Sequence, residues 1–227
     1  MIFRQLFDQK SWTYTYLLGS KKSKEAFLID PVLNHLEAYL KLMKELDLKL
    51  LVALDTHVHA DHVTATGNLR KKTNCAIAMG EQTKAEFVTE RLHEGETLKV
   101  GNLSLKALYT PGHTDDSYSF LMKDRIFTGD TLLIRGTGRT DFQNGSASAQ
   151  YDSLFNKILK LPESTFVYPA HDYKGWTRST IGEEKQFNPR LQVSSESEYI
   201  KIMDNLNLDR PALMDVAVPA NLKCGLE

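Results

Sequence analysis

The feature that most constrains this chain is a cluster of three histidines and one aspartate directly after an apolar run. Residues 50–54 are all apolar, and residues 57–62 read His-Val-His-Ala-Asp-His. In extended backbone, side-chain direction repeats every second residue, so His57 and His59 project to the same side. Imidazole is the commonest side-chain metal ligand and is mostly unprotonated at neutral pH. The segment therefore indicates a metal site at the end of a buried strand rather than a solvated loop.

Length and composition fit one globular domain. The chain has 227 residues, is 41% hydrophobic and carries a formal net charge of −1. We expect a single domain over residues 1–227, with a short helical or extended C-terminal segment from about 190 to 227. No basic stripe suggests nucleic acid, and no apolar stretch is long enough to cross a membrane. The start of the chain does not read as a secretory signal, and two isolated cysteines favour a reducing cytoplasmic location.

Hydrophobic periodicity predicts a mixture of strands and helices. A helix over 34–46 is expected to begin at an Asn34 cap with Glu37 three residues later. Mixed elements with long antiparallel stretches favour an α/β fold in which two sheets pack face to face with helices outside, a four-layer αββα sandwich. Strands are expected at 2–7, 12–18, 26–29, 48–54, 76–79, 97–100, 103–109, 118–122, 126–127 and 165–168. The other helices are expected at 65–72, 84–90, 151–161, 183–186 and 196–205.

Three later loops each place a histidine or an aspartate after a predicted strand. His113 follows the Pro-Gly turn of 110–114, Asp130 follows Gly129, and His171 lies in the loop after 165–168. Any one of these residues alone is weak support for a site. The carboxyl ends of strands are where α/β sheets commonly build their sites, so the convergence of all the loops predicts one centre.

Taken in order, these residues resemble the metal-binding signature of the metallo-β-lactamase superfamily. The resemblance implies an αββα sandwich with its site at one edge of the two sheets. The ligands alone would support two ions about 3.5–4 Å apart, as in a dinuclear zinc thioester hydrolase similar to glyoxalase II. In that hypothesis the first ion takes His57, His59 and His113. The second takes Asp61, His62 and His171, with Asp130 bridging.

Other segments resemble the persulfide dioxygenase family instead. The matching stretches are 132–143, 168–173, 188–190, 205–208, 217–221 and 224–225. This resemblance implies one Fe(II) per chain, held at the catalytic centre by His57, His113 and Asp130. Two imidazoles and one carboxylate leave three coordination positions open on non-heme iron. The remaining residues would be outer-shell or vestigial second-metal residues, namely His59, Asp61, His62 and His171.

The resemblance also implies the reaction, in which glutathione persulfide, O₂ and water give sulfite and glutathione. Glutathione carries two carboxylates and one ammonium, so its site should offer arginine and an acid. The residues of suitable chemistry in the matching segments are Arg139, Asp141, Tyr173 and Arg178. Arg139 is the preferred candidate, Arg135 could play the same part, and ordinary surface ion pairs are the alternative.

Several alternatives stay open at this point. One is the dinuclear zinc hydrolase, and another is a metal-free scaffold that binds partners through the same loops. The persulfide carrier could be glutathione, coenzyme A or another small thiol. The family often forms dimers, but the sequence does not fix the oligomeric state. Any sulfurtransferase partner would be a separate chain, because no rhodanese-like segment is present. His35 and His93 lie outside every motif and are expected to have no metal role.

Overall fold

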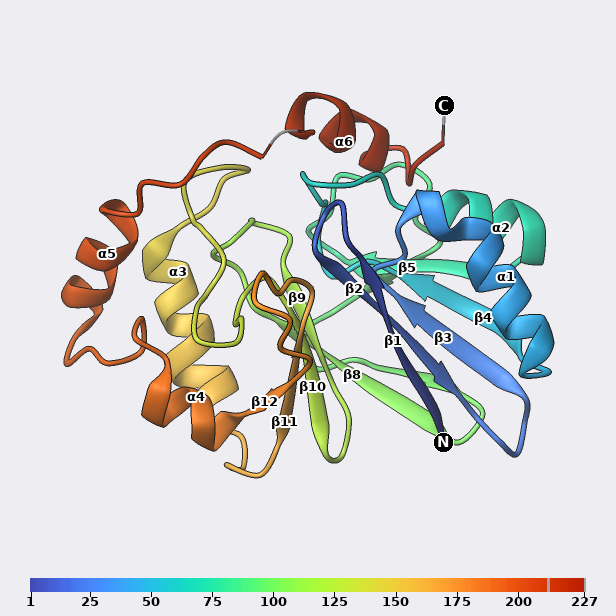
Figure 1. Cartoon of the computed structure of the whole chain (residues 1–227), viewed down its shortest axis with the longest axis horizontal. Coiled ribbons are helices and arrows are strands. Elements are labelled where there is room, and N and C mark those ends of the chain that lie inside the picture. Colours follow the sequence, from blue (N-terminus) through green and yellow to red (C-terminus); the bar gives the residue numbers. More distant parts are fainter. Residues whose placement is uncertain (212, 227) are drawn as a thin grey trace.

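The computed structural model describes residues 1–211 and 213–226 and has the predicted α/β fold. Two six-stranded sheets lie face to face, and helices cover their outer faces (Figure 1). The four-layer αββα prediction is therefore confirmed. Among the described residues, none of the helices combines the length and the apolar character needed to span a membrane.

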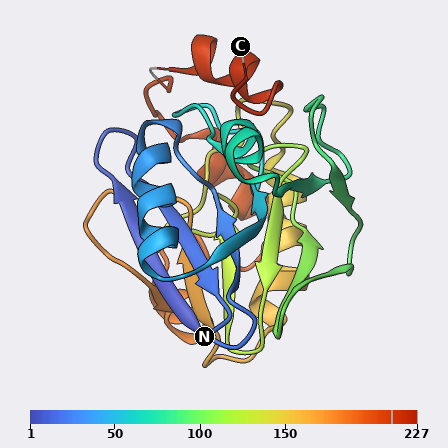
Figure 2. The ribbon, with the colours of Figure 1, turned by 90° about the vertical axis from the view of Figure 1, so that its right-hand side faces the viewer.

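The first sheet comes from the N-terminal part of the chain and has the order β1-β2-β3-β4-β5-β6. The β1–β2 and β2–β3 pairs are antiparallel, and the pairs from β3 to β6 are parallel. A 3₁₀ turn (Leu33–His35), α1 (Leu36–Glu45) and α2 (Thr66–Thr73) belong to this half, and α1 and α2 cover its outer face (Figure 2). The strands are β1 (Ile2–Asp8), β2 (Thr13–Gly19), β3 (Glu25–Ile29), β4 (Lys49–Leu54), β5 (Ala76–Gly80) and β6 (Glu90–Leu92).

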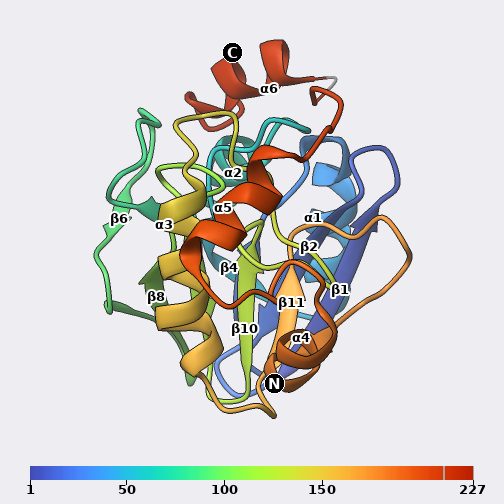
Figure 3. The same cartoon turned by 90° about the vertical axis from the view of Figure 1, so that its left-hand side faces the viewer.

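The second sheet has the order β12-β11-β10-β9-β8-β7 and is antiparallel except for the β10–β11 pair. Helices α3, α4 and α5 lie on its outer face (Figure 3), and α6 lies at the end of the sandwich opposite the N-terminus (Figure 1). The strands are β7 (Thr97–Val100), β8 (Leu103–Tyr109), β9 (Tyr118–Leu121), β10 (Arg125–Gly129), β11 (Phe166–Pro169) and β12 (Ser179–Thr180). The helices are α3 (Ala147–Asp152), α4 (Ile181–Phe187), α5 (Glu196–Asp204) and α6 (Met214–Asn221), and α3 continues as a π-helical stretch (Ser153–Lys157) and a 3₁₀ turn (Ile158–Lys160).

Aromatic side chains fill the space between the sheets. The rings of Tyr16 on β2 and Phe127 on β10 lie 4.9 Å apart, and both side chains are buried. Tyr168 on β11 packs edge-on against Tyr16 at 5.6 Å. Large buried aromatic side chains dominate the energetics of a protein core. This layer therefore fixes the position of the strand ends of one sheet relative to those of the other.

Some local predictions were wrong. The polar helix expected over 84–90 is absent, and the segment is irregular before it enters β6. Its polar groups form tertiary hydrogen bonds instead: Thr89 pairs with Ile77, and the Glu86 amide donates to the carbonyl of Leu222 at 2.8 Å. Asn34 does not cap a helix, because a 3₁₀ turn precedes α1 and no side-chain cap bond forms.

The helix expected over 151–161 begins earlier. Ser146 caps it by accepting a hydrogen bond from the amide of Ala149 at 3.2 Å. The short strands β6 and β12 and the helix α6 are further elements that the sequence did not predict. These elements are short, and long-range pairing decides their conformation more than local periodicity does.

Candidate metal centre

The predicted loops converge at one edge of the sandwich. The segment after β4 carries His57 to His62, the loop after β8 carries His113, and the loops after β10 and β11 carry Asp130 and His171. A backbone hydrogen bond connects the two halves here. The amide of Tyr118 donates to the carbonyl of Thr56 at 2.8 Å. This edge is therefore assembled from both sheets.

The structure brings His57, His113 and Asp130 together. Their donor atoms all lie within 4.8 Å of one another. Oδ2 of Asp130 lies 3.5 Å from Nε2 of His113 and 4.0 Å from Nε2 of His57. Two ring nitrogens and one carboxylate oxygen therefore face a common point, as ligands of a single ion do.

Hydrogen bonds fix which ring nitrogen each histidine presents. Nδ1 of His113 donates to the carbonyl of Arg139 at 2.7 Å, so Nε2 is the nitrogen that faces Asp130. Nδ1 of His57 lies 3.0 Å from the hydroxyl of Thr56, and that hydroxyl donates to Asp30 at 3.1 Å. Such outer partners orient ligating imidazoles and increase their basicity.

Charge states in the metal-free protein suit cation binding. Burial holds the pKa of His57 well below its ordinary value, and the neighbouring His59 and His113 lower it further. Burial alone would raise the pKa of Asp130, but His171, His113 and His57 outweigh it and hold that pKa well below its usual range. At neutral pH the site therefore offers a neutral imidazole at His57 and an ionised carboxylate at Asp130.

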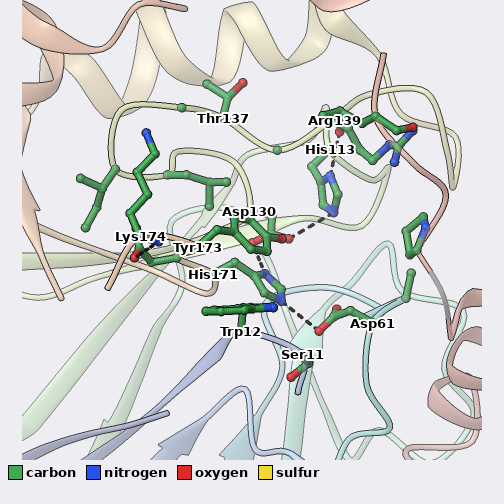
Figure 4. Close-up of a pocket in the computed structure, with 18 of the residues that line it drawn as sticks. Ser11, Trp12, Asp61, His113, Asp130, Thr137, Arg139, His171, Tyr173 and Lys174 are labelled. Carbon is green, nitrogen blue, oxygen red and sulfur yellow. Dashed lines mark hydrogen bonds and ion pairs between the residues drawn. The ribbon is translucent and has the colours of Figure 1, made fainter. Parts of the chain in front are cut away.

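The predicted outer residues form a second, adjoining group. Donor atoms of His59, Asp61 and His62 also lie within 4.8 Å of one another. Oδ2 of Asp61 is 2.8 Å from Nδ1 of His62 and 2.9 Å from Nε2 of His171, whose Nδ1 lies 2.7 Å from Oδ1 of Asp130 (Figure 4). Within the part of the chain that the structure describes, Nδ1 of His59 and Nε2 of His62 are buried without a hydrogen-bond partner.

Sequence reasoning missed several residues that support the histidine segment. Asp30, at the end of β3, accepts hydrogen bonds from the amide of Thr56 at 2.7 Å and from Nε2 of His59 at 3.1 Å. Burial of His59 opposes its charge, but Asp30 and Asp55 outweigh it and raise its pKa to about 9. Burial raises the pKa of Asp55 to about 7.

Asn221 on α6 also supports this segment from a distant part of the chain. Its side-chain amide donates to the carbonyls of His59 and His62 at 2.9 and 2.8 Å. Asp30 could have been identified from the sequence, because it is an aspartate at the end of a predicted strand. No comparable signal marks Asn221.

A cavity of about 640 Å³ opens onto the donor atoms of Asp61, His113, Asp130 and His171. Figure 4 shows Trp12, Tyr173 and Arg139 around it. Apolar side chains from two loops complete the wall, including Ile134 and Leu208. The site is thus a concave chamber with charged groups at its base.

The predicted substrate residues are placed differently from one another. Arg139 and Tyr173 line the cavity, whereas Asp141 and Arg178 are not among its lining residues. Nε and Nη2 of Arg139 donate to the two carboxylate oxygens of Asp141, both at 2.7 Å. The guanidinium also donates to the carbonyls of Leu208 at 3.2 Å and Asp209 at 2.6 Å. Arg139 therefore anchors the wall of the cavity.

The other arginines and two lysines complete the distribution of charge. Arg178 is exposed and stacks on the ring of Phe166 at 4.4 Å. Arg135 lines the cavity but pairs with Glu183 and Glu184. Lys10 and Lys174 line the cavity and were missed, because neither lies in a recognisable motif.

Residues 13–171 match the metallo-β-lactamase superfamily model. Over its full length the chain is 49% identical to "Persulfide dioxygenase ETHE1, mitochondrial" of Mus musculus and covers 90% of that protein. The chain belongs to the persulfide dioxygenase family of this superfamily. ETHE1 from Myxococcus xanthus, another member of the persulfide dioxygenase family, has a crystal structure that superposes with a TM-score of 0.98 at 54% identity, and each chain is covered completely.

A more distant solved structure carries iron. TTHA1623 "in a di-iron-bound form" matches with a TM-score of 0.69 and 25% identity, over 82% of this chain and 98% of that chain. The predicted family and fold are thus confirmed, and the chain is an oxidoreductase of the persulfide dioxygenase family rather than a metal-free scaffold. The comparisons support the hydrolase alternative less well.

Proposed function

We propose that this persulfide dioxygenase oxidises glutathione persulfide with O₂ and water, giving sulfite and glutathione, at one Fe(II) held by His57, His113 and Asp130. One observation carries the proposal. The two Nε2 atoms and one carboxylate oxygen of these residues converge within 4.8 Å, while His171 bonds to two carboxylates. The convergent group is a complete ligand set for one ion.

The donors fit ferrous iron. Two imidazoles and one carboxylate on one side of an ion are the facial set of non-heme Fe(II) oxygenases. Bound there, Fe(II) would bind the substrate sulfur and supply electrons to dioxygen. Neutral His57 and ionised Asp130 need no proton release before they coordinate a cation.

The chain's own residues orient this set and enclose the substrate. Nδ1 of His171 forms a hydrogen bond with Oδ1 of Asp130, so only Oδ2 of Asp130 faces His57 and His113. His171 would thereby hold Asp130 with the same oxygen towards the two candidate histidine ligands. Apolar Ile134 and Leu208 limit water at the cavity wall.

The cavity suits a small anionic thiol carrier. A volume of about 640 Å³ lies within the usual range for small-molecule sites. Lys10 and Lys174 provide ammonium groups on its wall that can meet carboxylates directly. Arg139 shapes the wall through Asp141, Leu208 and Asp209. Glutathione persulfide matches this charge and size.

An oxygen electrode tests the proposal. Protein loaded anaerobically with Fe(II) should consume O₂ when glutathione persulfide is added, and sulfite should accumulate. His57→Ala, His113→Ala and Asp130→Ala should each abolish uptake. Retained uptake in any one variant contradicts the ligand assignment. Thioester hydrolysis by protein holding two zinc ions, without O₂ uptake, would establish the hydrolase alternative instead.

Other parts of the hypothesis stay predictions. We expect a homodimer and a separate sulfurtransferase that supplies the persulfide. The cytoplasmic location is supported by Cys75 and Cys224, which are both buried free thiols. Size-exclusion chromatography with light scattering and microscopy of the tagged protein would test the oligomer and the location.

A further inference from the structure

We propose that Thr13, at the start of β2, is a positioning residue that limits this centre to one metal ion. The inference rests on the proposed mononuclear site and addresses why the second group of donors does not take an ion as well. Thr13 is fully buried, and its hydroxyl lies among that second group. Nothing in the histidine motif itself points to Thr13.

The hydroxyl of Thr13 contacts three residues that a second ion would need. It donates to Oδ2 of Asp61 at 3.0 Å, and it lies 3.1 Å from Nε2 of His171 and 3.3 Å from Nδ1 of His62. One oxygen atom therefore closes a hydrogen-bonded cluster of an acid and two imidazoles.

This cluster uses up donor atoms that would otherwise bind metal. Both nitrogens of His171 face carboxylates, at 2.7 Å to Asp130 and 2.9 Å to Asp61. A second ion could take His171 as a ligand only by displacing one of these carboxylates from its ring nitrogen. Oδ2 of Asp61 accepts from Thr13, His62 and His171 together.

What remains is a ligand set that lacks His171. Among the described residues of this second group, the buried nitrogens without a hydrogen-bond partner are Nδ1 of His59 and Nε2 of His62. Oδ1 of Asp61 lies 3.9 Å from Nδ1 of His59. A second ion would have to break the bonds of His171 and pull Asp61 away from Thr13 before it gained further ligands. The hydrogen-bonded cluster therefore competes with a second ion.

The fold holds Thr13 in this position. Thr13 forms an antiparallel bridge with His171, and the amide of Tyr14 donates to the carbonyl of Ala170 at 2.7 Å. The hydroxyl of Ser11 lies 2.7 Å from that of Thr13 and donates to Asp8 at 2.7 Å. The side chain is thus fixed by the β1–β2 hairpin, outside the histidine segment.

The number of metal ions bound per chain tests the role of Thr13 and does not depend on catalytic activity. Wild type, Thr13→Val and Thr13→Ser would be stripped, incubated anaerobically with excess Fe(II) or Zn(II), desalted and analysed by mass spectrometry for metal per chain. Valine keeps the volume and the backbone bridge but removes the hydroxyl, whereas serine keeps the hydroxyl. We expect about one ion in wild type and Thr13→Ser, rising towards about two in Thr13→Val.

Mn(II) loading gives an independent readout. Two Mn(II) ions about 3.5–4 Å apart are exchange-coupled, and electron paramagnetic resonance distinguishes them from an isolated ion. A coupled signal is expected in Thr13→Val alone. If Thr13→Val does not fold, Thr13→Ala is measured in the same way, and one ion in the folded variant overturns the role of Thr13. Two ions in wild type would instead overturn the mononuclear proposal itself.

Discussion

Nδ1 of His171 lies 2.7 Å from Oδ1 of Asp130, and this contact leaves the other oxygen of Asp130 as the one that faces His57 and His113. His171 is therefore placed to orient the carboxylate of Asp130. In the metal-free protein, burial would lower the pKa of His171, but Asp130 and Asp61 outweigh it and raise that pKa well above its ordinary value. A cationic imidazole between two acids keeps Asp130 ionised and fixed.

Replacement of His171 should weaken iron binding. His171→Ala removes the partner of Asp130, and the loss of such outer partners typically costs about 10–100-fold in metal affinity or activity. The measurement is an anaerobic Fe(II) competition titration with a chromophoric chelator. His93→Ala is the matched control, because His93 pairs with Glu81 on the exposed surface. Equal affinities in the two variants would show that His171 does not support the site.

Gly138→Ala should disrupt the centre, whereas Gly136→Ala should not. A Cβ atom on Gly138 would lie 2.2 Å from the carbonyl oxygen of Asp130 and 2.8 Å from Nδ1 of His113. A Cβ atom on Gly136 would meet only an ordinary contact, with Leu133 at 3.9 Å. We expect iron loss in the first variant and near wild-type iron in the second, measured as metal per folded chain. Full iron retention by Gly138→Ala would contradict this geometry.

Arg139 and Arg178, which the sequence grouped together, should behave differently. Arg139→Ala should raise KM for glutathione persulfide without loss of iron, because it releases Asp141 and the backbone of Leu208 and Asp209 from the cavity wall. Arg178→Ala should leave KM unchanged, since Arg178 stacks on Phe166 outside the cavity lining. Steady-state O₂ uptake with parallel iron analysis checks both variants. An unchanged KM in Arg139→Ala refutes its assignment.

Stability of the metal-free protein should fall in acid. Burial opposes ionisation of Asp61 and Asp130, but neighbouring histidines outweigh it and hold the pKa of each below the ordinary value of 3.8. A folded-state pKa below the unfolded value stabilises the protein above pH 3.8, and this stabilisation is lost as the pH falls towards the folded-state pKa.

The urea midpoint of chelator-treated protein between pH 3 and 5 measures this effect. The pH dependence should be shallower in Asp130→Asn, because that variant lacks one of the two carboxyl groups. An identical slope in wild type and variant would mean that Asp130 does not contribute. Asp47→Asn, which changes an exposed acid far from the centre, is the control for a general change in charge.

Local patterns in the sequence were sufficient to predict most strands, the αββα class and the residues that meet at the metal centre. Alternation along a strand and ligand spacing within His57 to His62 are short-range properties, so they can be read without a structure. The helix predicted over 84–90 shows the limit of this reasoning, because contacts with Ile77 and Leu222 decide its conformation.

Only the tertiary structure shows which residues orient the others through hydrogen bonds. The hydroxyl of Thr13 reaches His171, 158 positions away, and Asn221 reaches His59 across 162 positions. The guanidinium of Arg139 donates to backbone carbonyls about 70 residues further along the chain, and no local pattern predicts these contacts. Hydrogen-bond direction depends on where chain folding places each partner, so the sequence alone predicted candidate ligands but not the network that orients them.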